Sequence, residues 1–141
     1  MNPLHLSNQL CFPFYAISKE ISKRYRSILA PFHLTYPQYL VMIVLWEQDG
    51  IPLKAIGERL QLDSGTLTPL LNKLIKSGYI EKARNELDER ALVIKLTDAG
   101  KSLREQAATV PMQVQSVIGL TDDEYQLYKE MLGELSKKLN M

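Results

Sequence analysis

Apolar residues recur at helical spacing in two consecutive segments near the middle of the chain. Leu53, Ile56 and Leu60 lie three and four residues apart, which predicts a short amphipathic helix. The pattern then breaks, and Asp63 or Ser64 is suited to cap the start of a second helix. A single apolar stripe defines that second helix, formed by Leu67, Leu70, Leu71, Leu74 and Ile75.

Two short segments with strand-forming composition follow this helical pair. We expect the second helix to end at Gly78, which is suited to a helix C-cap. Residues 79–84 and 91–96 then predict two strands joined by a charged loop, residues 85–90. A helix, a turn, a second helix and a two-stranded wing predict a winged helix-turn-helix. The expected fold class is therefore mainly α with a small β wing.

The outer face of the second helix has the chemistry of a DNA-binding surface. Its side chains are small, hydroxylated, amide-bearing or basic, and they comprise Ser64, Thr66, Thr68, Asn72, Lys73 and Lys76. Such a face can enter a major groove about 12 Å wide and donate to phosphates and base edges. An alternative interpretation is that the leucine stripe is simply core and the charged hairpin simply solvated. A purely structural face would more often carry Glu–Lys pairs at four-residue spacing, so DNA binding is favoured.

The N-terminal part of the chain predicts two more helices. The first is expected to start near Ser7 or Pro13 and to end at Leu29, because Pro31 restricts the backbone there. The second begins after Thr35, the first residue of a T-x-x-Q capping box. Residues 39–46 of that helix are apolar almost all round. A helix without a polar face is buried, so this helix should form the centre of the domain.

The C-terminal part predicts a long helix and a final amphipathic helix. Thr97 is expected to cap a helix that runs toward Ile118 and is kinked at Pro111. Thr121 opens another capping box. The apolar residues of the helix that follows are Tyr125, Leu127, Tyr128, Met131, Leu132, Leu135 and Leu139.

This last helix has more apolar residues than one short core contact needs. Together with the first helix it is a natural dimer surface, although the same residues could instead cover the protomer's own core. A symmetric homodimer is favoured because paired winged helices match a pseudo-palindromic site in double-stranded DNA. We therefore predict one domain over residues 1–141, with dimerisation helices in 1–34 and 97–141 and a DNA-binding region in 35–96.

Composition and charge add few constraints. The 141 residues are enough for a sizeable core, and the net charge of +1 says little about nucleic acid. The net charge is +2 in residues 53–96 and −2 in residues 97–141, which is a weak separation of charge along the chain. No apolar run approaches the roughly 20 residues of a membrane span, and no signal-peptide pattern occurs. A cytoplasmic protein without a membrane partner is predicted, which agrees with a single cysteine.

Catalytic and metal-binding motifs are not evident in the sequence. His5 and His33 lack ligand spacing with Cys11 or with acidic pairs, so no metal or other cofactor is predicted. The separated glycines do not form a phosphate-binding loop, and no hydrolytic triad can be assembled. We predict that the protein is not an enzyme.

The reading-helix motif resembles that of a known family. DSGTLTPLL, followed by the DER of Asp88–Arg90, is similar to the MarR family of dimeric winged-helix repressors, and the likeness extends from Asn8 to about Leu135. The resemblance implies that Arg90 reaches a minor groove and that Asp88 orients it by a salt bridge. One departure is Asn72, where close relatives often have a basic residue. The implied DNA-binding residues are Ser64, Thr66, Thr68, Pro69, Asn72, Lys73, Lys76, Asp88 and Arg90.

Cys11 is the second chemical feature of the chain. A lone cysteine near an apolar helix is more often inert than reactive. However, both expected helix starts, Ser7 and Pro13, put Cys11 close to the positive end of the helix dipole. That position should favour the thiolate modestly, which is the form that peroxides attack.

The surroundings of Cys11 also resemble one branch of the MarR family. NQLCFPFYA, then Tyr25, then LTYPQYLVMIVLWE with Tyr36 is similar to the OhrR branch, which senses organic hydroperoxides. The resemblance implies that hydroxyls of Tyr25 and Tyr36 from the partner protomer hydrogen-bond the reactive cysteine. Because the chain has no second cysteine, it falls in the one-cysteine group of that branch. Tyr15 and Tyr39 could by comparison be simple core-edge residues.

The sequence therefore predicts a redox-sensing repressor. Organic hydroperoxide should oxidise Cys11 to sulfenic acid, which then forms a mixed disulfide with a low-molecular-weight thiol or is oxidised further. Either product is expected to release operator DNA. Three alternatives remain: a regulator of general thiol stress, a MarR-type regulator of phenolic ligands, and a thiol peroxidase. The all-helical winged pattern and the missing resolving thiol disfavour the last of these.

Overall fold

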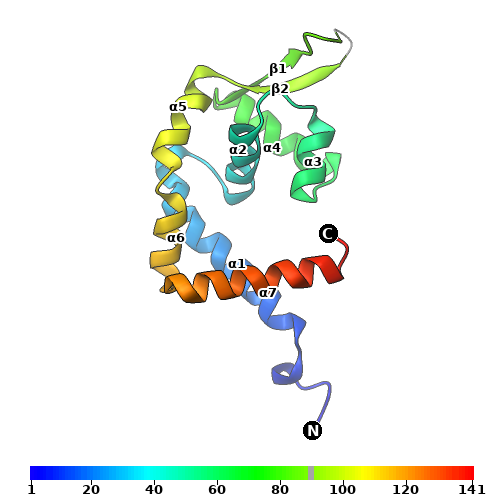
Figure 1. Cartoon of the computed structure of the whole chain (residues 1–141), viewed down its shortest axis with the longest axis vertical. Helices are drawn as coiled ribbons and strands as arrows, with labels where there is room; N and C mark the ends of the chain where they lie inside the picture. Colours follow the sequence, from blue (N-terminus) through cyan, green and yellow to red (C-terminus); the bar gives the residue numbers. More distant parts are fainter. Residues whose placement is uncertain (89–90) are drawn as a thin grey trace.

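A winged-helix unit occupies one end of the molecule, and the remaining helices extend from it (Figure 1). The computed structural model describes residues 1–88 and 91–141, so the prediction for Arg90 lies outside the described residues. The predicted fold class, mainly α with a small β wing, is confirmed. Within the described residues no single helix could cross a membrane, although Cys11–Phe32 and Tyr36–Glu47, bent by 65°, would together meet the requirements of length and composition.

The central helix is α2, Tyr36–Glu47. The predicted capping box is present, because the Thr35 hydroxyl accepts from Gln38 N and the Gln38 side chain accepts from Thr35 N at 2.9 Å. The helix contributes six buried residues, as expected for a segment that is apolar nearly all round. It packs against α1, α3, α4, α5 and β2, so it is the element around which the domain is built.

The helix-turn-helix consists of α3, Leu53–Leu60, and α4, Ser64–Lys76. The turn between them is tight because Gln61 adopts a left-handed conformation and Leu62 N donates to the Gly57 carbonyl oxygen at 2.9 Å. A Cβ at Gly57 would lie 2.7 Å from the Leu62 carbonyl oxygen, so the helix and the turn approach each other closely only because this position is glycine.

Helix α4 ends in the way the sequence predicts. Gly78 has a φ of 82°, its N–H donates to Ile75 O, and Tyr79 N donates to Leu74 O. These two bonds form a Schellman motif, which satisfies the last carbonyls of the helix and turns the chain toward the wing. Of the predicted apolar stripe, Leu67, Leu71 and Leu74 are fully buried.

The wing is an antiparallel pair, β1 (Ile80–Arg84) and β2 (Leu92–Leu96), in which Ile80 pairs with Leu96. Both strands lie within the predicted segments, one residue shorter at the start of each. An isolated bridge between Ile51 and Ile94 joins β2 to the segment before α3. The wing is thereby attached to the helical unit along its base, and its two strands extend away from the body (Figure 1).

The predicted long helix after the wing is in fact two helices, α5 (Asp98–Ala107) and α6 (Val110–Ile118). The break lies just before Pro111. A proline in the interior of a helix lacks the N–H donor and clashes with the carbonyl four residues back, here that of Ala107. The helix ends at that residue, and Pro111 becomes the second residue of α6, where no donor is needed.

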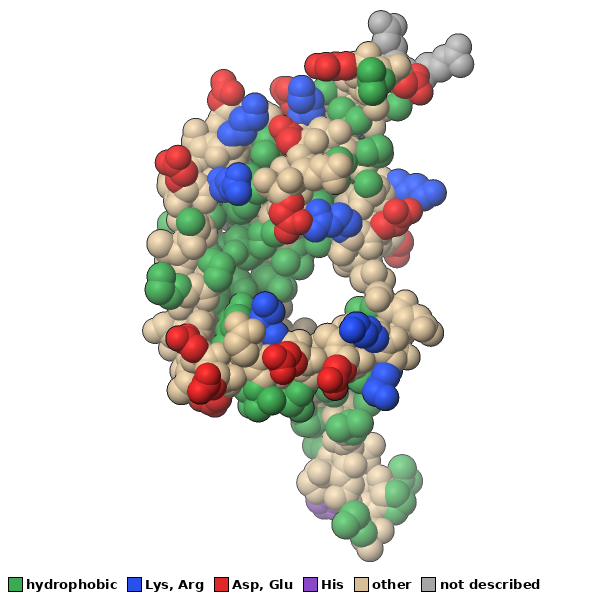
Figure 2. All heavy atoms as spheres, viewed as in Figure 1, with side chains coloured by type: hydrophobic (Ala, Val, Ile, Leu, Met, Phe, Trp, Pro, Cys, Tyr) green, Lys and Arg blue, Asp and Glu red, His purple; other side chains and the backbone are tan. Residues whose placement is uncertain are grey.

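The remaining helices are α1, Cys11–Leu29, and α7, Asp122–Lys138. Helix α1 begins at neither predicted position, because residues 6–8 form a separate 3₁₀ turn and Pro13 is tolerated within the first helical turn. Helix α1 packs against α2 and α6. None of the described residues of α7 is buried, and an opening separates this helix from the winged-helix unit (Figure 2).

Candidate DNA interface and redox site

The start of α4 is fixed by Asp63, which is the N-cap rather than Ser64. Its Oδ1 accepts from Thr66 N at 2.7 Å. That hydrogen bond stabilises the carboxylate and lowers the pKa of Asp63 below its usual value. The cap leaves the first turn of α4 ordered and presents Ser64 and Thr66 to solvent.

Most of the predicted reading residues of α4 are exposed. The exposed members are Ser64, Thr66, Pro69, Asn72, Lys73 and Lys76. Thr68 differs, because it is half-buried and therefore less available to DNA than the sequence pattern suggested. Pro69 lies inside the helix, so the carbonyl of Gly65 has no helical N–H donor from that position.

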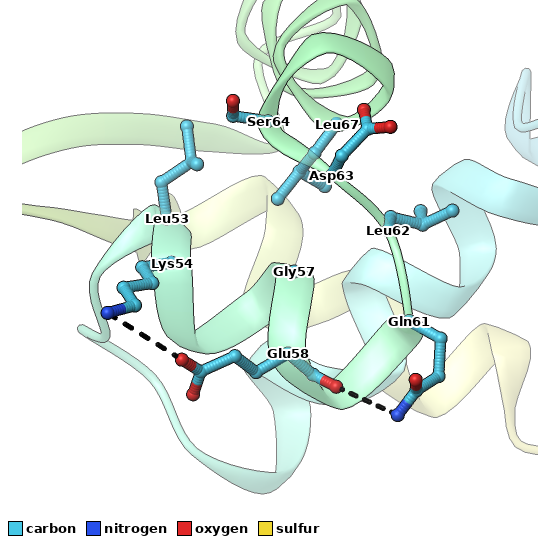
Figure 3. A pocket seen from close by; sticks show the side chains of 9 residues that line it. All are labelled: Leu53, Lys54, Gly57, Glu58, Gln61, Leu62, Asp63, Ser64 and Leu67. Carbon is cyan, nitrogen blue, oxygen red and sulfur yellow. Dashed lines mark hydrogen bonds and ion pairs between the residues drawn. The ribbon is translucent and has the colours of Figure 1, made fainter. Parts of the chain in front are cut away.

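An open groove of about 960 Å³ runs beside the start of α4 (Figure 3). It lies between α3 and the first turn of α4, with Leu53, Leu62 and Leu67 as its apolar lining. On the α3 side Lys54 pairs with Glu58 at 4.0 Å, and both side chains are exposed. This groove could not be predicted from the sequence, because it arises from the angle between two helices rather than from a motif.

The wing contributes only part of its predicted site to the described structure. The carbonyl of Asp88 accepts from Ala91 N at 3.0 Å and closes the turn at the wing tip. The predicted ion pair of Asp88 with Arg90 involves a residue outside the described part of the chain. It stays a prediction.

Three polar contacts hold the base of the wing to the rest of the domain. The Thr97 hydroxyl donates to the Gly78 carbonyl oxygen at 2.5 Å, and Asp49 Oδ1 accepts from Leu96 N at 2.8 Å. The indole Nε1–H of Trp46 donates to the carbonyl oxygen of Gly100 at 2.9 Å. The roles of Asp49 and Trp46 could not be predicted from the sequence, since each bond joins residues about fifty positions apart.

Cys11 is the first residue of α1, and it is exposed as a free thiol. This position agrees with the expected proximity to the helix N-terminus. Its sequence neighbours Leu10, Phe12 and Phe14 are apolar, and all three side chains are exposed. The described chain thus offers its thiol to solvent beside a set of apolar side chains that are also uncovered.

Tyr25 and Tyr36 form a stacked pair with ring centroids 4.3 Å apart. Tyr39 joins them at 5.9 Å from Tyr25, so it is part of the cluster and not only a core-edge residue. Its spacing of three residues from Tyr36 on one helix was the signal that could have identified it. Trp46 extends the cluster through an edge-to-face contact with Tyr39, with ring centroids 6.5 Å apart.

Burial raises the pKa of Tyr25 well above its usual range, and the neighbouring Tyr36, Tyr39 and Tyr125 raise it further, since phenolates would repel one another. Burial also raises the pKa values of Tyr36 and Tyr39. The phenols therefore stay protonated at neutral pH. Each can donate a hydrogen bond to a nearby anion.

Within one chain the cysteine and the tyrosines lie far apart. Cys11 and Tyr25 are 14 residues apart in the single helix α1, a separation of about 21 Å along its axis. The structure of one protomer therefore does not bring the three predicted redox residues together. Their predicted contact requires a second protomer.

Comparison with known proteins identifies the family. A family model of the SarA/Rot transcriptional regulators matches residues 23–107. The regulator TtmR of Methylorubrum extorquens is 45% identical over 99% of this chain and 71% of its own length. The organic hydroperoxide resistance regulator of Bacillus subtilis is 41% identical over 94% and 88%.

Solved structures agree with these relatives. Reduced AbfR bound to DNA is 38% identical, with a TM-score of 0.80 over 96% of this chain and 92% of that protein. The relatives are regulators and not enzymes, and their shared architecture is the winged helix described above. The chain therefore belongs to the SarA/Rot family of transcriptional regulators and has a winged-helix fold, with an organic hydroperoxide regulator among its relatives.

Proposed function

We propose that this regulator is a homodimeric repressor that releases its operator when organic hydroperoxide oxidises Cys11. The observation that carries the proposal is the stacked pair of phenols, Tyr25 and Tyr36, whose raised pKa values keep both hydroxyls protonated and able to donate to a thiolate. The exposed thiol of Cys11, which as a thiolate could accept hydrogen bonds from such phenols, lies at the other end of α1. A second protomer that packs antiparallel along α1 would bring the two together.

The uncovered apolar surface supports this dimer. Half or more of the surface of each of four apolar side chains on α7 is exposed, namely Leu127, Tyr128, Met131 and Leu132. Phe12, Phe14, Tyr15 and Ile17 on α1 are also exposed. So many large apolar groups on two helices are characteristic of an interface rather than of a monomer surface. The predicted dimerisation regions, residues 1–34 and 97–141, contain both helices.

The proposed chemistry begins with the thiolate of Cys11. Its sulfur attacks one peroxide oxygen, the O–O bond breaks, and the leaving alkoxide takes a proton to become an alcohol. The sulfur is oxidised by two electrons to sulfenic acid. A low-molecular-weight thiol then attacks that sulfur and displaces water, which leaves a mixed disulfide. Hydrogen bonds from the partner's tyrosines would stabilise the thiolate, and exposed Phe12 and Phe14 suit an alkyl peroxide better than hydrogen peroxide.

The DNA contacts are assigned to α4 and the wing. Ser64 and Thr66 at the start of α4 would meet base edges in the major groove, while Lys73 and Lys76 would contact phosphates. Arg90 of the wing would reach the minor groove, with Asp88 beside it. Two protomers would bind half-sites about 34–36 Å apart, a spacing that leaves little tolerance for movement between them. AbfR, solved on DNA in reduced and overoxidised forms, supports a regulator of this kind.

Operator binding before and after oxidation tests the proposal. Fluorescence anisotropy on DNA from the chain's own upstream region would give the affinity of reduced protein and of protein treated with stoichiometric cumene hydroperoxide. Mass spectrometry of the same samples would follow Cys11. We expect affinity to fall in step with oxidation, and Cys11→Ser to keep the reduced affinity under peroxide. Tyr25→Phe and Tyr36→Phe should slow the oxidation of Cys11 without preventing operator binding.

The other outcomes separate the remaining alternatives. Equal sensitivity to cumene hydroperoxide, hydrogen peroxide and diamide would indicate a regulator of general thiol stress. Binding that persists while Cys11 oxidises would refute the redox mechanism and leave a DNA-binding regulator of another signal, such as a phenolic ligand. For the wing, Arg90→Ala should lower discrimination between operator and random DNA by about 1–3 kcal/mol. An unchanged ratio would remove Arg90 from the reading surface.

A further inference from the structure

Helix α2 touches both the tyrosine cluster and the base of the wing. Its first residues include Tyr36 and Tyr39, which pack with Tyr25 of α1. Trp46 lies near its other end, roughly 15 Å further along the axis. A buried, well-packed helix of this length moves as a rigid body, so a displacement at one end is felt at the other. In Figure 1, α2 lies between α1 and the wing.

An unbroken series of aromatic contacts follows this helix. The rings of Tyr25 and Tyr36 are stacked, and the ring centroids of Tyr36 and Tyr39 lie 6.4 Å apart. Tyr39 and Trp46 meet edge to face, with ring centroids 6.5 Å apart. The spacings of 6.4 and 6.5 Å lie within the range in which aromatic rings attract one another specifically, and the stacked Tyr25–Tyr36 pair is closer still. The series ends at a hydrogen bond, because the Trp46 indole N–H donates to the carbonyl oxygen of Gly100 at 2.9 Å.

Gly100 lies in the first turn of α5, just after the wing, where the backbone is closely packed. A Cβ at this residue would lie 2.1 Å from the Tyr79 carbonyl oxygen. The first turn of α5 is therefore in close backbone contact with the residue that precedes β1. Asp49, three residues after Trp46, holds the same junction through Leu96 N at 2.8 Å. Two hydrogen bonds, from Trp46 near the end of α2 and to Asp49 just after it, therefore hold the first turn of α5 and the last residue of β2.

We propose that Trp46 is a positioning residue that couples the state of the tyrosine cluster to the placement of the wing on DNA. Oxidation of Cys11 changes what the partner's Tyr25 and Tyr36 hydroxyls contact, and the aromatic series passes the resulting shift of α2 to Gly100. The inference rests on the proposed redox function and extends it from the sensor to the DNA-binding end. The tryptophan is suited to this role because its ring packs against Tyr39 while its N–H binds the junction.

Trp46→Phe separates these two contributions. The phenyl ring keeps an aromatic contact with Tyr39, but the bond to Gly100 is lost. Tyr79→Phe is the matched control, because it also removes one side-chain donor to a backbone carbonyl, the bond from Tyr79 Oη to Phe32 O at 3.0 Å. Operator affinity is measured for both variants and the wild type, reduced and after stoichiometric cumene hydroperoxide, with mass spectrometry of Cys11 in each sample.

The informative quantity is the ratio of reduced to oxidised operator affinity. We expect this ratio to fall about fivefold in Trp46→Phe, a size typical of mutations that alter coupling between sites. Cys11 should oxidise at the wild-type rate, and Tyr79→Phe should keep the wild-type ratio. A Trp46→Phe protein that loses affinity equally in both states, or that keeps the wild-type ratio, would overturn the inference while the redox function stands. A wild-type protein that binds equally in both states would overturn both.

The chain contains one tryptophan, so its emission reports on this residue alone. Stoichiometric peroxide should change the emission of Trp46 in the wild type and in Tyr79→Phe, and it should leave the emission of Cys11→Ser unchanged. The change should develop with the same rate as operator release. Emission that is unaffected while the operator is released would show that the signal bypasses Trp46, and the inference would be wrong.

Discussion

Replacing Gly57 with alanine tests whether the close approach of α3 to its turn sets the geometry of the DNA-binding unit. An added Cβ would lie 2.7 Å from the carbonyl oxygen of Leu62, which is 0.7 Å inside the 3.4 Å at which ordinary contact begins. The clashing atom is backbone, and the Leu62 N–H is itself bonded to Gly57 O at 2.9 Å. The turn must therefore open, and the start of α4 must move with it.

The magnitude follows from two opposing effects. Alanine is better than glycine within a helix by about 0.5–1 kcal/mol, whereas an extra methyl group in a well-packed site costs about 1–3 kcal/mol. We expect a net loss of about 1–2 kcal/mol in the free energy of unfolding, with weaker operator binding in addition. Urea denaturation at a fixed protomer concentration measures the first effect, because a dimer's stability depends on concentration. Fluorescence anisotropy measures the second.

Gly65→Ala is the matched control, since it makes the same change on the neighbouring helix. The nearest atom to its added Cβ is Asp63 Oδ1 at 3.4 Å, which is an ordinary van der Waals contact, so the cap need not move. This variant should be as stable as the wild type or slightly more stable. If Gly57→Ala unfolds at the same urea concentration as Gly65→Ala, the proposed role of the close approach is wrong.

Three further predictions concern the core, the tyrosines and the DNA surface. Leu71→Ala should lower the free energy of unfolding by about 2–5 kcal/mol in the same urea assay, because Leu71 is fully buried in the apolar stripe of α4. The raised pKa of Tyr25 favours its neutral form in the folded state, so the resulting stability should be complete below about pH 10 and be lost as the pH rises further. Urea midpoints between pH 9 and 11 should fall more steeply in the wild type than in Tyr25→Phe. Lys73→Ala should weaken binding to operator and random DNA alike and reduce the salt slope by about one per protomer, whereas Lys129→Ala on α7 should not.

Local chemistry explains which parts of the fold could be predicted from sequence. The caps at Thr35, Asp63, Thr97 and Thr121 all form, because a helix cap depends on residues within one turn of it. The order of helix, turn, helix and wing follows from hydrophobic spacing for the same reason. Proline effects were less predictable at Pro111, since whether a helix kinks or breaks depends on the packing on either side.

Contacts between segments that are distant along the chain could not be predicted from the sequence. The bonds of Trp46 and Asp49 to the junction after the wing join parts of the chain that show no mutual pattern. The partial burial of Thr68 likewise depends on how α4 packs against its neighbours. The resemblance to the OhrR branch suggested that Tyr25 and Tyr36 belong together. It gave no reason to expect Tyr39 and Trp46 to continue their cluster.

The capping of α4 has a consequence for how this helix can lie on DNA. Asp63 keeps a negative charge at the helix N-terminus, whereas Lys73 and Lys76 lie in its last turns. Phosphates would repel the first end and attract the second, so the helix is electrically asymmetric along its length. On the proposed operator, this asymmetry favours one polarity, with the amino end held away from the sugar–phosphate backbone and the carboxyl end resting against it. On a palindromic operator, charge would therefore set the direction in which α4 lies on each half-site before any base is recognised.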